Sequence, residues 1–76
     1  MKMKNILSKR LRECRKDAKL TQKEVAIYSD ISEKAYQNYE LMAREPKLEI
    51  LIRIADTLKV SLDYLTGRTN NKTINK

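Results

Sequence analysis

The fold is decided by residues 20–40, which read LTQKEVAIYSDISEKAYQNYE. Thr21 and Glu24 form a capping box, because the threonine hydroxyl accepts a helix N–H while the glutamate reaches back to the threonine N–H. That helix should end near Asp30, since aspartate tolerates the left-handed backbone better than most residues. Ser32 then offers a new N-cap. Two short helices joined by so tight a turn must cross at a steep angle, so the stretch predicts a helix-turn-helix unit.

The helix that follows Ser32 should have two different faces. Spacings of three and four residues group the inner side chains: Ile31, Ala35, Tyr36 and Tyr39. The same spacing groups an outer set, four of whose five members are polar and able to contact bases or phosphates: Glu33, Lys34, Gln37, Asn38 and Leu41. Tyr36 and Tyr39 could alternatively stack on single-stranded nucleic acid. We interpret both tyrosines as core residues because they lie opposite Lys34 and Asn38.

Periodic apolar residues predict helices before and after this unit. The first helix has an apolar stripe: Leu7, Leu11, Cys14 and Ala18. The fourth has another: Leu48, Leu51, Ile52, Ala55 and Leu58. Pro46 suits the first turn of that helix, and a last short helix runs from an N-cap at Ser61 to Gly67. The sequence therefore predicts an all-α, compact five-helix bundle over residues 1–68, with a polar, disordered tail at residues 69–76.

The net charge of the 76-residue chain is +7, which favours a polyanionic partner such as nucleic acid. The same charge could simply keep a small protein soluble. Residues 1–20 hold eight basic and two acidic residues, which gives +6, whereas residues 21–45 hold three and five, which gives −2. The remainder contributes +3. The excess charge thus lies in the first helix, outside the segment predicted to make the contacts.

The sequence shows no sign of an enzyme, a cofactor-binding protein or a membrane protein. The chain contains no histidine, and we find no phosphate-binding glycine loop and no cluster of metal ligands, so we expect neither an enzyme nor a cofactor. No stretch approaches the roughly 18 apolar residues of a membrane span. A single cysteine and a charged start without an apolar segment favour a cytoplasmic protein. We interpret Cys14 as a small core residue, with a redox switch as the alternative.

Four segments resemble the Cro and phage-repressor type of helix-turn-helix domain, also called the XRE family. They lie within residues 6–68 and comprise Arg10–Arg15, Leu20–Ala26, Tyr36–Glu40 with Arg44–Pro46, and Leu51–Gly67. The family often has glycine at three positions where this chain has Lys19, Asp30 and Met42. A positive φ at Met42 would cost about 1–2 kcal/mol. The loop at residues 41–43 should therefore be strained or follow a different path.

The resemblance implies a sequence-specific regulator of transcription, in the first place a repressor, that binds double-stranded DNA. The helix Ser32–Glu40 would read the major groove. Its implied base contacts are Glu33, Lys34, Gln37 and Asn38. The implied phosphate contacts are Thr21, Gln22, Lys23, Ser32 and Arg44. Lysine can donate to guanine O6 and N7, and asparagine can pair with adenine N6 and N7. Arg15 and Glu40 occupy positions that form a structural ion pair in the family. The alternative to the base and phosphate contacts is a solvated polar face. The alternative to the ion pair is that Arg15 and Glu40 are two unrelated surface charges.

A likeness of this kind also implies a homodimer on a palindromic operator, since such units usually bind two half-sites about one helical turn apart. No membrane and no small-molecule cofactor is expected. The rival hypothesis is a protein-binding module on the same fold, such as an antitoxin or an antirepressor. The −2 charge of residues 21–45 favours this rival.

Overall fold

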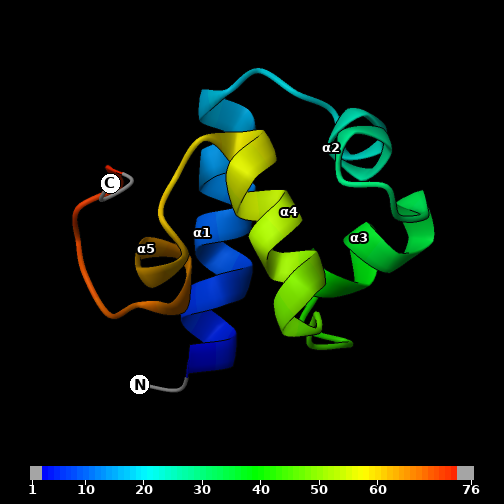
Figure 1. Ribbon diagram of the computed structural model, residues 1–76. Coiled ribbons are helices and arrows are strands. Elements are labelled where there is room, and N and C mark those ends of the chain that lie inside the picture. Colours follow the sequence, from blue (N-terminus) through cyan, green and yellow to red (C-terminus); the bar gives the residue numbers. More distant parts are fainter. Residues whose placement is uncertain (1–2, 74–76) are drawn as a thin grey trace.

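The computed structural model describes residues 3–73, with side chains from Asn5 onward. Within this range the chain forms five α-helices (Figure 1): α1 (Met3–Asp17), α2 (Gln22–Tyr28), α3 (Glu33–Glu40), α4 (Leu48–Leu58) and α5 (Leu62–Thr66). No strand occurs among these residues, so the all-α prediction is confirmed. None of the five helices has the length and apolar character that crossing a membrane would require.

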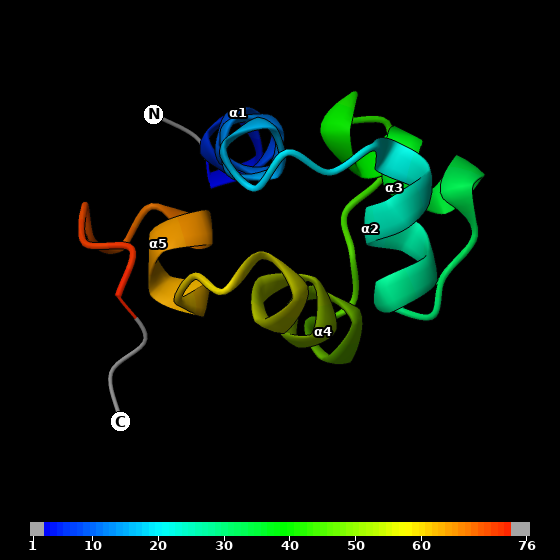
Figure 2. The same cartoon turned by 90° about the horizontal axis from the view of Figure 1, so that it is seen from above.

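Two helices, α1 and α4, run through the middle of the molecule and divide it into two sides. Viewed from above, α2 and α3 lie on one side of them and α5 lies on the other (Figure 2). Helix α1 packs against both α3 and α5, and α4 packs against both α2 and α5. The helix-turn-helix pair is thus held by one central helix behind each of its members.

The core lies between these helices and contains most of the predicted stripe of α1. Leu11 is fully buried, and Cys14 is buried beside it, which confirms its interpretation as a core residue. The prediction for Ala18 is wrong: α1 ends at Asp17, so Ala18 lies in the following turn and is exposed. Tyr36 is fully buried, and Tyr39 is 8% exposed, so both tyrosines belong to the core as predicted.

The predicted core stripe of α4 is partly wrong. Leu48 and Ile52 are 65% and 43% exposed, whereas Ile54, which the stripe left out, is completely buried. Leu48, Leu51, Ile52 and Ala55 have the spacing i, i+3, i+4, i+7, and so does the set that is actually buried: Leu51, Ile54, Ala55 and Leu58. Because α4 is apolar around much of its circumference, periodicity alone cannot select the inner face. Pro46 lies before the N-cap at Lys47 rather than in the first turn.

Within residues 3–73, four residues other than glycine take the left-handed backbone conformation: Lys19, Asp30, Met42 and Lys59, with φ between 59° and 62°. Three of them are the positions at which glycine was expected and not found. The chain therefore keeps the turns that the resemblance implies. Asp30 tolerates this conformation, whereas the side chains of Lys19 and Met42 disfavour it. The strain expected at Met42 is present, whereas the same conformation at Lys59 was not predicted.

The segment after α5 turns back over α1 and α5. The Arg10 guanidinium donates to the carbonyl oxygens of Tyr64 and Thr69, at 2.6 and 2.7 Å. Lys72 forms an ion pair with Asp17 at 3.1 Å, and its carbonyl accepts the Ser61 N–H. Residues 69–73 of the predicted tail thus contact the domain, and residues 74–76 lie outside the described residues. The domain boundary at residue 68 stays a prediction.

Candidate nucleic-acid interface

Both helices of the helix-turn-helix unit start at the predicted caps. The Thr21 hydroxyl accepts the Glu24 N–H at 3.0 Å, and the Glu24 carboxylate accepts the Thr21 N–H at 2.9 Å, so the capping box is complete. The Ser32 hydroxyl accepts the Ala35 N–H at 3.0 Å. Between the caps, the Ile31 N–H donates to the carbonyl of Ala26 and closes the turn. These local bonds fix where α3 begins and hence which of its residues face outward.

The outer face of α3 contains the four residues predicted to contact bases. Glu33 and Lys34 are exposed, and Gln37 and Asn38 are half-buried. The Gln37 amide approaches the Glu33 carboxylate at 3.4 Å, a weak contact along the helix. Within the described part of the chain, the side chains of Lys34 and Asn38 form neither an ion pair nor a hydrogen bond. Their polar groups are therefore available to a ligand.

The residues predicted to contact phosphates lie in three separate segments around α3. Thr21, Gln22 and Lys23 stand at the start of α2, Ser32 stands before α3, and Arg44 lies in the loop after it. All of them are exposed except Gln22, which is half-buried. The hydroxyl groups of Thr21 and Ser32 accept cap hydrogen bonds through their oxygen atoms, so each keeps its proton for donation to an anion.

A buried ion pair joins three helices behind this face. Arg15 of α1 and Glu40 of α3 pair through Nε and Oε2 at 2.7 Å, with side-chain exposures of 15% and 2%. A second guanidinium nitrogen donates to Oε1 of Glu40 at 3.3 Å. The Gln22 amide of α2 donates to the same Oε1 at 3.0 Å. A two-point contact of this kind fixes direction as well as distance, so the pair sets how α1, α2 and α3 meet.

The environment of Glu40 favours its charged form. Burial alone would raise the pKa of this carboxyl, but the hydrogen bonds from Arg15 and Gln22 and the nearby Tyr36 hydroxyl outweigh it and leave the pKa below its ordinary value. The same hydrogen bond raises the pKa of Arg15. Burial raises the pKa of Tyr36, whose hydroxyl has no hydrogen-bond partner of standard geometry among the residues described. The ion pair is thus the main source of compensation for the buried charge.

Helix α1 also closes the C-terminal end of α3. The Ser8 hydroxyl and the Arg12 guanidinium both donate to the main-chain carbonyl of Glu40, the latter at 3.2 Å. These bonds satisfy a carbonyl that the last turn of a helix leaves without a partner. Sequence reasoning missed both residues. A signal was available, because Ser8, Arg12 and Arg15 recur at i, i+4 and i+7 and share one face of the helix.

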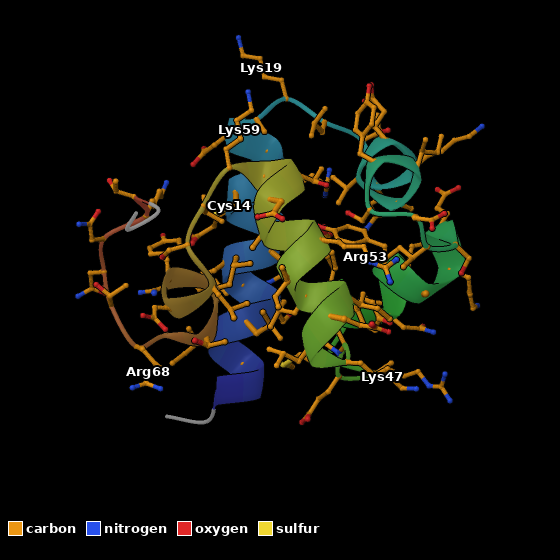
Figure 3. The ribbon with its side chains drawn as sticks, viewed as in Figure 1. Cys14, Lys19, Lys47, Arg53, Lys59 and Arg68 are labelled. Carbon is orange, nitrogen blue, oxygen red and sulfur yellow. The ribbon has the colours of Figure 1, made fainter. Side chains whose placement is uncertain are left out.

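The net charge of −2 over residues 21–45 is not concentrated on the outer face of α3. Glu40 is buried and paired with Arg15, which belongs to another segment. The Glu24 carboxylate accepts the Thr21 N–H in the capping box. Asp30, which follows α2, lies 3.9 Å from the guanidinium of Arg53 on α4 (Arg53 is labelled in Figure 3). On the outer face of α3, Glu33 remains, and it stands in the first turn, where a negative charge suits the helix dipole. The Arg15–Glu40 pair thus removes one of the five negative charges that favour the rival hypothesis, and Glu45 stays exposed in the loop after α3.

Comparison with known families agrees with this geometry. Residues 11–65 match the family described as helix-turn-helix, a range that contains α2 to α4 complete. The chain belongs to the helix-turn-helix family. Both helices of the unit, with Arg15 and Glu40, lie within the matched range, so the XRE-type resemblance seen in the sequence is confirmed.

Three curated relatives of this helix-turn-helix protein are similar over most of its length. An uncharacterized HTH-type transcriptional regulator of Bacillus subtilis, YqaE, is 47% identical over 88% of this chain and 59% of its own length. The HTH-type transcriptional regulator ImmR of Bacillus subtilis is 38% identical over 92% and 63%. The cryptic phage CTXphi transcriptional repressor RstR of Vibrio cholerae is 39% identical over 82% and 55%. The chain thus spans less than two thirds of each relative. No solved structure matches it significantly.

Proposed function

We propose that this helix-turn-helix protein is a sequence-specific regulator of transcription that binds double-stranded DNA and acts as a repressor. One observation supports this above the others: α3 keeps Tyr36 and Tyr39 in the core, while Lys34 and Asn38 lie on its outer face. There their side chains form no hydrogen bond or ion pair with the other described residues. A helix of this kind fits the major groove of B-DNA, where its polar side chains meet the base edges. The names of the relatives, which include a phage repressor, support regulation of transcription and repression.

Each polar residue of α3 then has a role that follows from its chemistry. Lys34 would donate to guanine O6 and N7, and Asn38 would pair with adenine N6 and N7. Gln37 would also contact adenine, and Glu33 would accept from cytosine N4. Because Gln37 and Glu33 approach each other at 3.4 Å in the free protein, binding would replace a weak contact rather than break a strong one.

The phosphate contacts would hold α3 in the groove without reading sequence. Gln22 would be the best placed, since one N–H of its amide already donates to Glu40 and the other is free to donate to a phosphate. Thr21, Lys23 and Ser32 would contact the same backbone, and Arg44 would contact it beyond the end of α3. The Arg44 N–H lies 3.4 Å from the Asn38 carbonyl, so its position follows that of α3.

The test separates base contacts from phosphate contacts. Asn38→Ala should weaken binding to the preferred site by about 1–3 kcal/mol and relax the choice at one base pair, with random-sequence DNA bound nearly as before. Arg44→Ala should weaken binding to both DNAs alike and lower the salt slope by about one unit. The preferred site is first selected from a random pool, and wild type and variants are then titrated on both DNAs at two salt concentrations.

The outcomes also decide against the rival function. If Lys34→Ala and Asn38→Ala leave the sequence preference unchanged, the outer face of α3 is not the contact surface. If the wild-type protein ignores duplex DNA even at low salt, DNA binding is refuted, because groove-binding proteins show non-specific affinity for duplex DNA. The protein-binding module, an antitoxin or antirepressor, would then be the better account.

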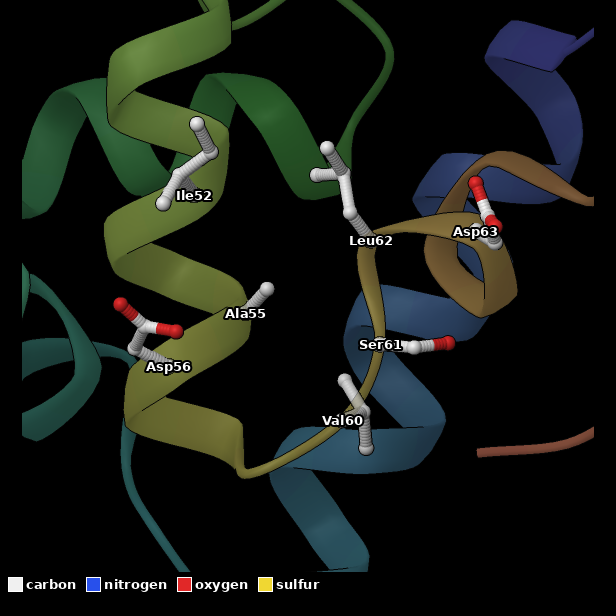
Figure 4. Close-up of a pocket in the computed structure, with 7 residues that line it drawn as sticks. All are labelled: Ile52, Ala55, Asp56, Val60, Ser61, Leu62 and Asp63. Carbon is white, nitrogen blue, oxygen red and sulfur yellow. The ribbon is translucent and has the colours of Figure 1, made fainter. Parts of the chain in front are cut away.

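We further propose a homodimer in the cytoplasm that binds a palindromic operator. Support comes from the apolar side chains that α4 leaves exposed, Leu48 and Ile52. Ile52 also lines a pocket between α4 and α5 (Figure 4), together with Ala55, Val60 and Leu62 among others. A second copy placed on this surface would cover it and present a second α3. Dimers of helix-turn-helix units bind half-sites about 34–36 Å apart, one turn of DNA, which is the spacing we expect for the operator.

A further inference from the structure

The positive charge of α1 is not explained by the contacts described so far. Within the described residues, Arg15 is paired with Glu40, and Arg10 donates to Tyr64, Thr69 and Asn70. Lys9, Arg12 and Lys16 form no ion pair with any acidic side chain in this part of the chain. All three are exposed. The excess charge that the sequence places in the first helix is therefore largely presented to solvent.

These three side chains form one stripe that we call the α1 basic stripe. Lys9, Arg12 and Lys16 recur at i, i+3 and i+7, so they share one face of the helix. Of the two acidic residues in α1, Asp17 is neutralised by Lys72. Glu13 remains near the stripe and lowers its net charge from three to two. Seven residues of α-helix span about 10 Å, which corresponds to about three phosphates along the axis of one DNA strand.

The position of Arg12 joins this stripe to the proposed DNA interface. Its guanidinium lies 3.2 Å from the main-chain carbonyl of Glu40, the last residue of α3. The side chain of the same Glu40 accepts a hydrogen bond from Gln22, a proposed phosphate contact. One residue thus has Arg12 at its carbonyl and Gln22 at its carboxylate. The middle residue of the stripe thus lies where the start of α2 and the end of α3 meet.

We propose that Lys9, Arg12 and Lys16 form a second phosphate-binding surface, which continues the DNA contact from the helix-turn-helix unit onto the flanking sugar-phosphate backbone. This inference rests on the proposed function, the binding of duplex DNA. Because contacts to phosphates carry no sequence information, the stripe would contribute affinity and salt dependence without sequence preference. It also accounts for a basic excess that lies outside the residues that would read the bases.

The experiment removes charge from the stripe without disturbing the fold. The variant is Lys9→Gln with Lys16→Gln, because neither side chain makes a hydrogen bond or ion pair among the described residues. Arg12 is kept, since its guanidinium also closes α3. The matched control is Lys59→Gln with Arg68→Gln, which removes the same charge from exposed positions. Arg68 follows α5, on the side of the molecule away from α3 (Figure 3).

Affinity for random duplex DNA is measured over a range of salt concentrations. Neutralising two phosphate contacts should reduce the slope of log K against log salt by about 1.8 in the stripe variant. The control variant should keep the wild-type slope, and the preference for a selected site should be the same in all three proteins. Equal slopes for the stripe and control variants would overturn the inference and leave the proposed function standing. Failure of the wild type to bind duplex DNA would overturn both.

Discussion

Replacing Arg15 by alanine should cost a large share of the stability of this domain. The Glu40 side chain is 2% exposed and depends on Arg15 for two of its hydrogen bonds. Removing one partner of a buried pair leaves an uncompensated charge, which typically costs about 3–5 kcal/mol. At about 0.05–0.15 kcal/mol per residue, the whole chain has only about 4–11 kcal/mol of stability. Urea denaturation followed by circular dichroism measures the loss directly.

A double-mutant cycle separates this pair from its surroundings. Glu40→Gln should cost less than Arg15→Ala, because it keeps a hydrogen-bonding side chain of the same shape and leaves no buried negative charge. The double variant should be more stable than the sum of the single losses predicts, by about 0.5–3 kcal/mol. Additive losses would show that the two residues do not interact, and the 2.7 Å contact would then contribute nothing to folding.

The pH dependence of stability is a second measure of the same pair. The pKa of Glu40 in the folded protein lies below its ordinary value, chiefly through Arg15, although burial opposes the shift. A depressed pKa contributes stability that is complete above the unfolded-state pKa, about 4.3, and that is lost as the pH falls through the folded-state value. The unfolding free energy should thus fall below about pH 4.3 more steeply in the wild type than in Glu40→Gln. Parallel curves for the two proteins would contradict this assignment.

Two further predictions concern the backbone and the surface. Met42→Gly should raise the urea midpoint, because relief of the strain at φ 62° outweighs the extra entropy of the unfolded glycine, for a net gain in stability of up to about 1.5 kcal/mol. Asp30→Gly should gain less stability. A lower midpoint for Met42→Gly would refute the strain at this residue. Leu48→Glu with Ile52→Glu should abolish the proposed dimer in sedimentation equilibrium, while Ile27→Glu, at a residue 62% exposed on α2, should leave it intact; a dimer that survives the first change uses another surface.

Local signals in the sequence were sufficient to place the helix-turn-helix unit. Two helix starts are predicted by capping residues, one by Thr21 with Glu24 and one by Ser32, because each cap satisfies main-chain N–H groups within its own turn. The structure has both caps where the sequence places them. Tyr36 and Tyr39 were assigned to the core by spacing, and their burial follows from the same geometry. Features determined within a few residues of chain were therefore predictable.

Features that depend on packing between helices were not. The sequence predicted Leu48 and Ile52 as inner residues of α4, whereas the structure buries Ile54 instead. Which of them is buried depends on how α4 lies against α2 and α5, and no local pattern contains that information. The contact of Arg12 with the end of α3 joins residues 28 positions apart. The spacing of Ser8, Arg12 and Arg15 places them on one face of α1, but it does not identify the carbonyl that Ser8 and Arg12 contact. The left-handed conformation at Lys59 ends α4 without the glycine that would have announced it.

One side of α3 holds the helix in the fold and the other is proposed to contact DNA, which explains how a small domain could vary its binding preference. The residues that fix α3, Tyr36 and Glu40, are buried, and Glu40 pairs with Arg15 of α1. The side chains of Lys34 and Asn38 form no hydrogen bond or ion pair with the other described residues. Substitutions at Lys34 or Asn38 should therefore change which bases are favoured at little cost in stability, since surface changes away from structural contacts usually stay within about 0.5 kcal/mol. Gln22 belongs to both sides, because its amide supports Glu40 and is placed to meet a phosphate. A change at Gln22 should thus weaken folding and DNA binding together, which neither outer residue of α3 should do.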